Sequence, residues 1–276
     1  MVDPSNYQGI GQFGRAYRIM LENDSHAPGS VDRVLAERMI RLCAETAAYL
    51  YEQYTSTTVV YQPGSRPELE QHLEQAVAGA DSDEERIAAI ARFCAGVGRA
   101  APAEMDATPF GGSEEQIIRR GSYMCTDLAR VGCALCQIAG LPARVVMLFD
   151  TDQAYSGHVI IEAHRSGAWG AVDTTTDVVY RHQDGRPAST WELMNRPDLI
   201  EAHARGPSTP YARAGQFRAA AISNYPVWQW REYDYTESPV NEYYRSILEM
   251  SDRGWPGELR WLHGEDAACD SEQAEG

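Results

Sequence analysis

The stretch Cys125-Thr-Asp-Leu-Ala-Arg-Val-Gly-Cys-Ala-Leu-Cys-Gln-Ile-Ala139, followed by Gly140-Leu-Pro142, decides the fold that the sequence predicts. Apolar or small side chains recur on one face at helical spacing, at Leu128, Ala129, Gly132, Cys133 and Cys136. The Gly-Leu-Pro sequence is typical of the end of a helix. We therefore expect a helix from about Cys125 to Ala139.

Three apolar runs follow this helix, with short polar segments between them: Val145–Phe149, His158–Ala163 and Trp169–Asp173. Short apolar runs bounded by turn residues are typical of strands. The helix and the three runs therefore predict an α+β fold, in which the helix packs on an antiparallel sheet.

The chain before residue 112 is predicted to be helical. Apolar residues recur at helical spacing from Ser30 to Tyr54. A second helix begins at Pro67 and ends near Gly79, and Ser82 with Glu85 forms a capping box for a third.

Two further segments are predicted to start or form helices. Asp81–Glu85 lacks the glycine and the ligand spacing of a calcium loop, so we interpret it as the start of the third helix. A short helix is expected over Ser113–Arg120.

Composition places the chain among globular proteins. Of its 276 residues, 43% are hydrophobic and 23% are charged. No apolar stretch reaches about 18 residues and no basic flank precedes an apolar run at the N-terminus, so we expect a soluble, cytoplasmic protein without a membrane partner. The six cysteines are expected to be reduced.

Charge limits the partners. The net charge of -16 argues against nucleic acid and would attract a cationic or amine partner, although acidity of this kind also serves solubility. Cys133 and Cys136 form a CxxC pair without further zinc ligands at similar spacing, so we interpret them as core residues. Neither a metal nor a cofactor is predicted.

His158 and Asp173 lie on consecutive predicted strands. If the hairpin turns at Arg165-Ser166, the two residues are directly opposed, with Cβ atoms about 5 Å apart. If it turns at Ser166-Gly167, His158 lies opposite Thr175 and Asp173 is diagonal to it, at about 7 Å. Either register keeps the carboxylate within reach of the imidazole.

Cys125 lies at the start of its helix, where backbone N–H groups and the helix dipole favour a thiolate. His158 could take its proton while Asp173 orients the ring, which makes a nucleophile, base and carboxylate triad. The backbone N–H of Cys125 could serve an oxyanion hole, with Tyr123 or Gln116 as a second donor. Each residue alone could be structural, but the combination points to catalysis.

Three stretches resemble the transglutaminase-like superfamily, which belongs to the papain-like cysteine enzymes. They are Arg120-Gly-Ser-Tyr-Met-Cys125-Thr-Asp-Leu-Ala129, continuing to Gly140-Leu-Pro-Ala-Arg144-Val-Val; Gly157-His158-Val-Ile-Ile-Glu162; and Trp169-Gly-Ala-Val-Asp173-Thr. The resemblance covers about Ser113 to Thr176 and assigns the catalytic roles to Cys125, His158 and Asp173. Thr174 departs from the family, which usually has proline there, and Tyr123-Met124 replaces small residues.

The resemblance implies a cysteine acyltransferase that forms or exchanges an amide bond through a Cys125 acyl-enzyme. Its acyl donor would be an amide or thioester and its acceptor an amine, either a small molecule or a peptide. A cysteine amidase or protease, which transfers the acyl group to water, is the first alternative. A catalytically silent interaction module on the same fold is the second.

Four regions are expected along the chain. Residues 1–112 form a helical N-terminal region of the same domain, 113–180 the transglutaminase-like catalytic core, 181–263 an aromatic-rich C-terminal extension and 264–276 a disordered tail. The aromatic residues of the extension either cover the core or line an acceptor pocket or a dimer contact, which leaves a homo-oligomer open.

Overall fold

The computed structural model describes residues 39–42, 44–101, 113–122, 124–149, 157–201 and 219–224. In chain order its elements are β1 (Met39–Leu42), α3 (Ala44–Glu52), α4 (Pro67–Ala76), α5 (Asp83–Arg99), α6 (Glu114–Arg120), α7 (Cys125–Ile138), β2 (Ala143–Phe149), β3 (Gly157–Arg165), β4 (Ala168–Asp173), β5 (Val178–Val179), α8 (Thr190–Asn195), the 3-10 helix η3 (Pro197–Leu199) and β6 (Ala219–Ser223). The aromatic stretch after residue 224 and the predicted tail 264–276 lie outside the described residues.

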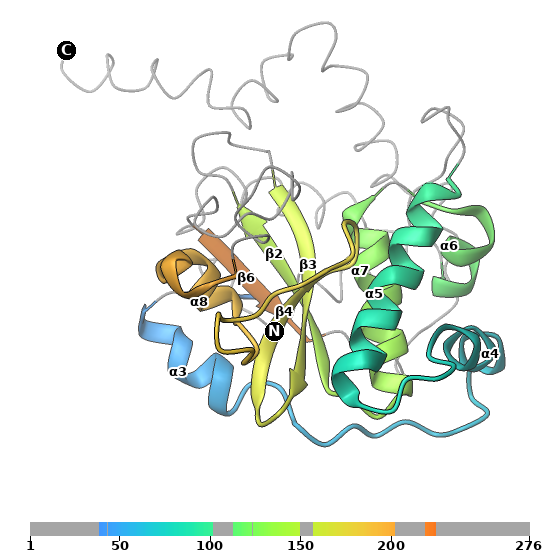
Figure 1. Cartoon of the computed structure of the whole chain (residues 1–276), viewed down its shortest axis with the longest axis horizontal. Coiled ribbons are helices and arrows are strands. Elements are labelled where there is room, and N and C mark those ends of the chain that lie inside the picture. The colour runs from blue at the N-terminus through green and yellow to red at the C-terminus, as the bar shows by residue number, and fades with distance from the viewer. Residues whose placement is uncertain are drawn as a thin grey trace, which may run out of the picture.

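The strands form a six-stranded sheet in the order β1-β6-β2-β3-β4-β5, and all its neighbouring pairs are antiparallel. Helices α4, α5, α6 and α7 lie on one side of the sheet, and α3 and α8 on the other (Figure 1). The predicted α+β fold, with the Cys125 helix packed on an antiparallel sheet, is therefore confirmed. Across the described ranges, no helix has both the length and the apolarity that a membrane span needs.

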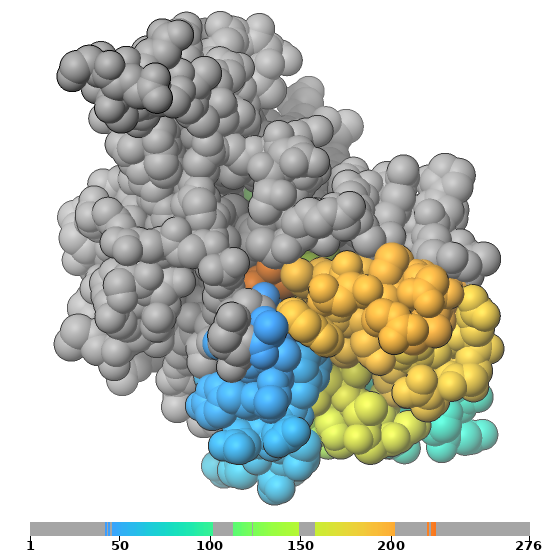
Figure 2. Space-filling view, turned by 90° about the vertical axis from the view of Figure 1, so that its left-hand side faces the viewer, coloured from blue at the N-terminus to red at the C-terminus, as the bar shows by residue number. Residues whose placement is uncertain are grey.

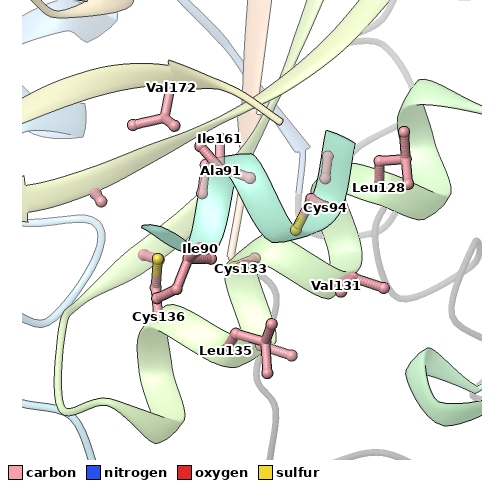
Figure 3. Packing of buried hydrophobic residues seen from close by; sticks show 14 of the residues in the cluster. Ile90, Ala91, Cys94, Leu128, Val131, Cys133, Leu135, Cys136, Ile161 and Val172 are labelled. Carbon is pink, nitrogen blue, oxygen red and sulfur yellow. The ribbon is translucent and has the colours of Figure 1, made fainter. Parts of the chain in front are cut away.

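The main core lies between α5, α7 and the sheet. Along β3, Val159, Ile161 and Ala163 belong to this core, whereas Ile160 belongs to a second apolar cluster on the opposite face. Figure 3 shows Ile90 and Cys94 of α5 packed beside Cys133 and Cys136 of α7. The interpretation of the CxxC pair as core residues is confirmed, because both side chains are fully buried there.

Capping boxes begin two of the predicted helices. Ser82 accepts from the backbone N–H of Glu85 at the start of α5, while the Glu85 carboxylate accepts from the N–H of Ser82. Ser113 and Gln116 make the same exchange at α6. Asp81–Glu85 is thus a helix start, as predicted.

The helix predicted from Ser30 to Tyr54 is wrong over Met39–Leu42, which form strand β1. Helix α3 begins only at Ala44. The segment Ile40-Arg41-Leu42 fits a two-residue period as well as a helical one, and pairing with β6 selects the strand. Because β1 and β6 are far apart along the chain, local sequence patterns do not reveal that they pair.

The β3–β4 hairpin turns at Ser166-Gly167, which is the second of the two predicted registers. Arg165 pairs with Ala168 and Ile161 with Val172. Ser166 has φ 50° and Gly167 has φ 77°, and a two-residue turn of this hand needs positive φ at both positions. Glycine adopts such a conformation without strain, so the turn is centred on Ser166-Gly167 and the register at Arg165-Ser166 is wrong.

A buried ion pair joins the sheet to the helices on its second face. The Arg144 guanidinium of β2 donates to Glu162 of β3 through Nε at 2.9 Å and Nη2 at 2.7 Å. Glu162 also accepts from the Tyr51 hydroxyl at 2.8 Å and from the Thr190 N–H at 2.7 Å. The α3 segment and the α8 segment that carry these partners lie side by side in Figure 2.

Two aromatic rings enclose the Arg144 cation. Its guanidinium carbon lies 4.1 Å from the centre of the Trp169 ring and 4.9 Å from that of Tyr51. Arg144 also donates to the carbonyl oxygen of Leu50. Because Arg144 and Glu162 are both fully buried, each charge depends on the other and on these polar contacts.

Glu162→Gln should therefore lower the free energy of unfolding by about 3–5 kcal/mol, since it leaves the buried Arg144 charge without its counterion. Urea unfolding measures the change. Glu68→Gln, which removes a carboxylate from the exposed pair with Arg119, is the matched control and should leave stability nearly unchanged. Equal stability of the two variants would contradict the structural role of Glu162.

Candidate active site

Cys125 is the first residue of α7, and the N-cap residue before it, Met124, makes no side-chain capping hydrogen bond. The first N–H groups of a helix have no partner within the helix, so they present a positive end to the Cys125 sulphur. Cys125 is half-buried. The helix start therefore presents a thiol with an electropositive backbone beside it.

The other described thiols lie in the core. Cys94, Cys133 and Cys136 are fully buried. Burial raises the pKa of Cys94 and Cys133, and raises that of Cys136 to about 12. These three thiols are therefore neutral and enclosed, whereas Cys125 is accessible; Cys43 and Cys269 lie outside the described residues.

Asp173 is held at both of its oxygens. Oδ2 lies 3.0 Å from Nε2 of His158. Oδ1 accepts from the backbone N–H groups of Thr175 at 2.9 Å and Thr176 at 3.2 Å. Since the carboxylate is fully buried, these contacts determine which way it faces. The diagonal pairing predicted from the hairpin thus brings the two side chains into contact.

His158 also forms a hydrogen bond with Cys125. Because Nε2 is engaged by Asp173, Nδ1 is the ring nitrogen left for the sulphur. Burial alone lowers the pKa of His158, but hydrogen bonding and charge interactions with Asp173 and Cys125 outweigh burial and raise it to about 10. Burial raises the pKa of Asp173, yet the bond to His158 leaves it below its ordinary value.

The structure thus brings together the three predicted site residues, Cys125, His158 and Asp173, in one hydrogen-bonded chain. A thiol beside a base that is oriented by a carboxylate is the arrangement of a cysteine nucleophile. Their catalytic roles stay predictions.

A polar turn precedes Cys125 and fixes where α7 starts. The Ser122 hydroxyl donates to Oδ2 of Asp127 at 2.8 Å and accepts from the backbone N–H of Met124 at 3.1 Å. Arg120 and Arg130 lie 3.2 Å and 3.5 Å from the same carboxylate. Asp127 therefore ties the turn to the first part of the helix.

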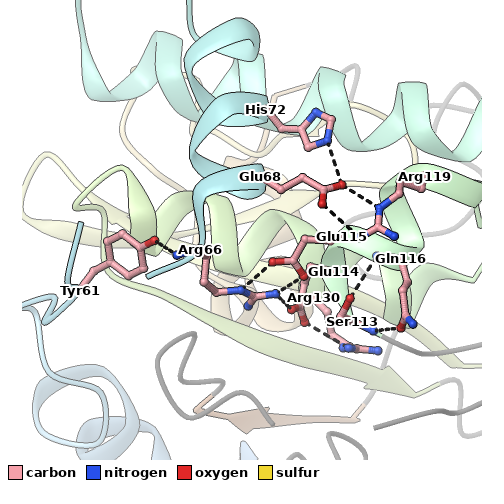
Figure 4. A network of polar contacts seen from close by, with 10 residues as sticks. All are labelled: Tyr61, Arg66, Glu68, His72, Ser113, Glu114, Glu115, Gln116, Arg119 and Arg130. Atoms are coloured by element: carbon pink, nitrogen blue, oxygen red, sulfur yellow. Dashed lines mark hydrogen bonds and ion pairs between the residues drawn. The ribbon is translucent and has the colours of Figure 1, made fainter. Parts of the chain in front are cut away.

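Buried charges extend this network away from the site, as Figure 4 shows in part. Arg130 contacts Glu114 at 3.1 Å, and Glu114 contacts Arg66 at 2.7 Å. Sequence reasoning missed this group. The signal for it was the pair Asp127 and Arg130, two charges three residues apart on a helix otherwise predicted to lie in the core.

Of the two suggested second oxyanion donors, Gln116 is engaged elsewhere, and Tyr123 stays a prediction. The Gln116 side chain is used in the capping box of α6, where its Oε1 accepts from the Ser113 N–H at 2.7 Å. Tyr123 lies outside the described residues. Within the described ranges, no group of three His, Cys, Asp or Glu side chains is arranged to hold a metal ion.

Residues 70–174 match the family model of the transglutaminase-like superfamily, and this segment contains Cys125, His158 and Asp173. The chain therefore carries a transglutaminase-like superfamily domain, as its motifs predicted.

A solved structure from Cytophaga hutchinsonii, described as a "putative cysteine protease", is 19% identical to this chain with a TM-score of 0.33. The similarity covers 53% of this chain and 46% of the other, so it spans less than half of that protein. No curated protein matches the chain significantly.

The raised pKa of His158 predicts how stability depends on pH. The folded chain holds this proton more tightly than the unfolded chain, in which an ordinary histidine has a pKa of about 6.5. The stability gained is complete below about pH 6.5 and is lost as pH rises to about 10. Urea unfolding should show wild type more stable than His158→Gln at pH 6, with the difference shrinking towards pH 10. A difference that stays constant or widens would contradict the assignment.

Proposed function

We propose that this protein is a cysteine acyltransferase, which forms or exchanges an amide bond through an acyl-enzyme on Cys125. The observation that carries the proposal is the hydrogen-bonded chain from Cys125 through His158 to Asp173. The transglutaminase-like match over residues 70–174 supports the same class of chemistry.

In the first step, the proton of the Cys125 thiol already resides on His158, whose raised pKa keeps the ring protonated. The Cys125 thiolate attacks the acyl carbon of the donor. The intermediate oxyanion lies near the first N–H groups of α7. The bond between the acyl carbon and the leaving nitrogen then breaks, and the His158 imidazolium gives its proton to the departing amine or ammonia. A thioester on Cys125 remains.

In the second step, an acceptor amine attacks the thioester. His158 takes the proton that the amine loses, and the proton passes to the sulphur as the carbon–sulphur bond breaks. Asp173 stabilises the imidazolium in both steps without accepting its proton. A new amide and the original Cys125 thiol are the products.

Charge favours an amine as the acceptor. A net charge of -16 gives the surface a negative potential that raises the local concentration of cationic amines. Water can attack the same thioester, and the triad performs hydrolysis by the same two steps. Transfer and hydrolysis therefore differ in the acceptor and share the machinery.

The nucleophile can be tested by alkylation with iodoacetamide at pH 6, followed by peptide mass spectrometry. Cys125 should react at least about tenfold faster than the other cysteines, and His158→Ala should slow it by about tenfold or more, because the base that activates the thiol is gone. His72→Ala is the control and should leave the alkylation rate unchanged. His72 is on α4, where it lies beside Glu68 of the same helix and Phe93 of α5.

The comparison of wild type with His158→Ala separates activation of the Cys125 thiol from its accessibility. An accessible but ordinary thiol would react at the same rate in wild type and His158→Ala. Equal rates in those two proteins, or equal labelling of all six cysteines, would rule out the activated nucleophile and leave the interaction module as the better interpretation.

The acceptor is tested with a glutamine-containing peptide as acyl donor and a labelled primary amine. Incorporation of the amine should exceed formation of the free acid, and Cys125→Ala should abolish both products. Mass spectrometry of the donor distinguishes the two. Formation of free acid alone, at saturating amine, would reassign the protein as an amide hydrolase.

A further inference from the structure

Gly132 of helix α7 lies directly against Thr174, the residue that follows β4. A Cβ atom placed on Gly132 would lie 2.6 Å from Cγ2 of Thr174, and 3.5 Å from both Sγ of Cys94 and Cδ1 of Ile161. A carbon–carbon distance of 2.6 Å is well inside van der Waals contact, so even alanine does not fit unless Thr174 moves. The Thr174 methyl group thus occupies the space that a side chain at residue 132 would fill.

The methyl group of Thr174 makes this contact, and the hydroxyl has no comparable role. Thr174 is fully buried, and its Oγ1 has no hydrogen-bond partner within the described part of the chain. A buried hydroxyl without a partner is unfavourable, because it has lost its hydrogen bonds to water. The hydroxyl therefore stabilises nothing that the structure describes, whereas the methyl group packs against α7.

Thr174 also directly follows Asp173 in the turn that orients the carboxylate. Oδ1 of Asp173 accepts from the N–H groups of Thr175 and Thr176, the next two residues. A displacement of Thr174 away from α7 moves these amides, and with them the carboxylate that contacts His158.

Cys125 is tied to the other side of the same contact. It lies seven residues before Gly132 on α7, about 10 Å along a continuous helix at 1.5 Å per residue. The position of Cys125 relative to Asp173 therefore depends on how closely α7 and the 173–176 turn approach each other.

We propose that Gly132 and Thr174 are a pair of positioning residues that set the distance between the Cys125 helix and the Asp173 carboxylate. The inference rests on the proposed function, because it concerns the alignment of that site. It assigns a role to two residues that need not touch the substrate.

Four variants test the pair: Gly132→Ala, Thr174→Ser, the double variant Gly132→Ala/Thr174→Ser, and Thr174→Val. The first adds a methyl group to the contact, the second removes one, and the double variant moves the methyl group from residue 174 to residue 132. Thr174→Val keeps the Cγ2 methyl and replaces the hydroxyl with a second methyl of similar size, so it is the matched control.

Two readouts follow the alignment: the rate of Cys125 alkylation at pH 6, and the titration midpoint of the His158 ring by NMR. Gly132→Ala should slow alkylation about tenfold and move the midpoint at least about one pH unit towards 6.5, since the contact with Asp173 is disturbed. The double variant should return both values close to wild type. Thr174→Val should stay within about twofold of the wild-type rate.

Several results would overturn the pair. One is a wild-type rate and midpoint in Gly132→Ala. Another is failure of the double variant to recover, including a double variant that does not fold, as judged by near-ultraviolet circular dichroism. A loss in Thr174→Val as large as that in Gly132→Ala would assign the effect to the hydroxyl. Helix propensity alone favours alanine over glycine, so a loss in Gly132→Ala reports the contact.

Failure of the proposed function would give a different set of results from failure of the positioning pair. If wild-type Cys125 alkylates no faster than in His158→Ala, the nucleophile hypothesis fails, while the His158 midpoint still follows the distance between α7 and Asp173. A midpoint that shifts in Gly132→Ala and recovers in the double variant would then support the positioning pair alone.

Discussion

The Glu162 carboxylate holds three parts of the molecule together from the centre of the sheet. It accepts hydrogen bonds from Arg144 of β2, from Tyr51 of α3 and from the backbone N–H of Thr190 at the start of α8. A buried charge is tolerated only when its partners are held in good geometry, so these elements cannot shift independently. The strands β2 and β3 become a rigid base, and α7 packs on the opposite face of that base.

The two faces of the sheet are stabilised by different kinds of contact. One face is held together by the Arg144–Glu162 pair and its aromatic neighbours, while the other carries an apolar core in which α7 runs against β2 and β3. At the start of α7, the apolar contacts give way to the buried charges around Asp127 and Arg130. Cys125 lies at the boundary between the apolar core and these buried charges, and contacts of both kinds fix the start of its helix.

Local patterns were enough to predict most of the central unit. Helix α7, strands β2 to β4 and the contact between His158 and Asp173 follow from spacing and hairpin geometry. The choice of register needed the positive φ angles at Ser166 and Gly167, which sequence alone left open. Strand β1 lies in a segment that the sequence predicts to be helical, and β6 is not predicted, because their pairing joins segments about 180 residues apart. In the sequence, Gly132 is only a small residue on an apolar helix face. Its close approach to Thr174 cannot be predicted, because Thr174 comes from a distant part of the chain.

The strand order has a consequence for synthesis of the chain. Strand β6 lies between β1 and β2, so β1 has no neighbour in the sheet until residues 219–223 have been made. The segment from Cys125 to Asp173 leaves the ribosome well before that point, and until then β2 exposes an open edge of unpaired backbone groups. The late insertion of β6 closes that edge, so a nascent chain cut short before residue 219 is both incomplete and prone to pair with other chains.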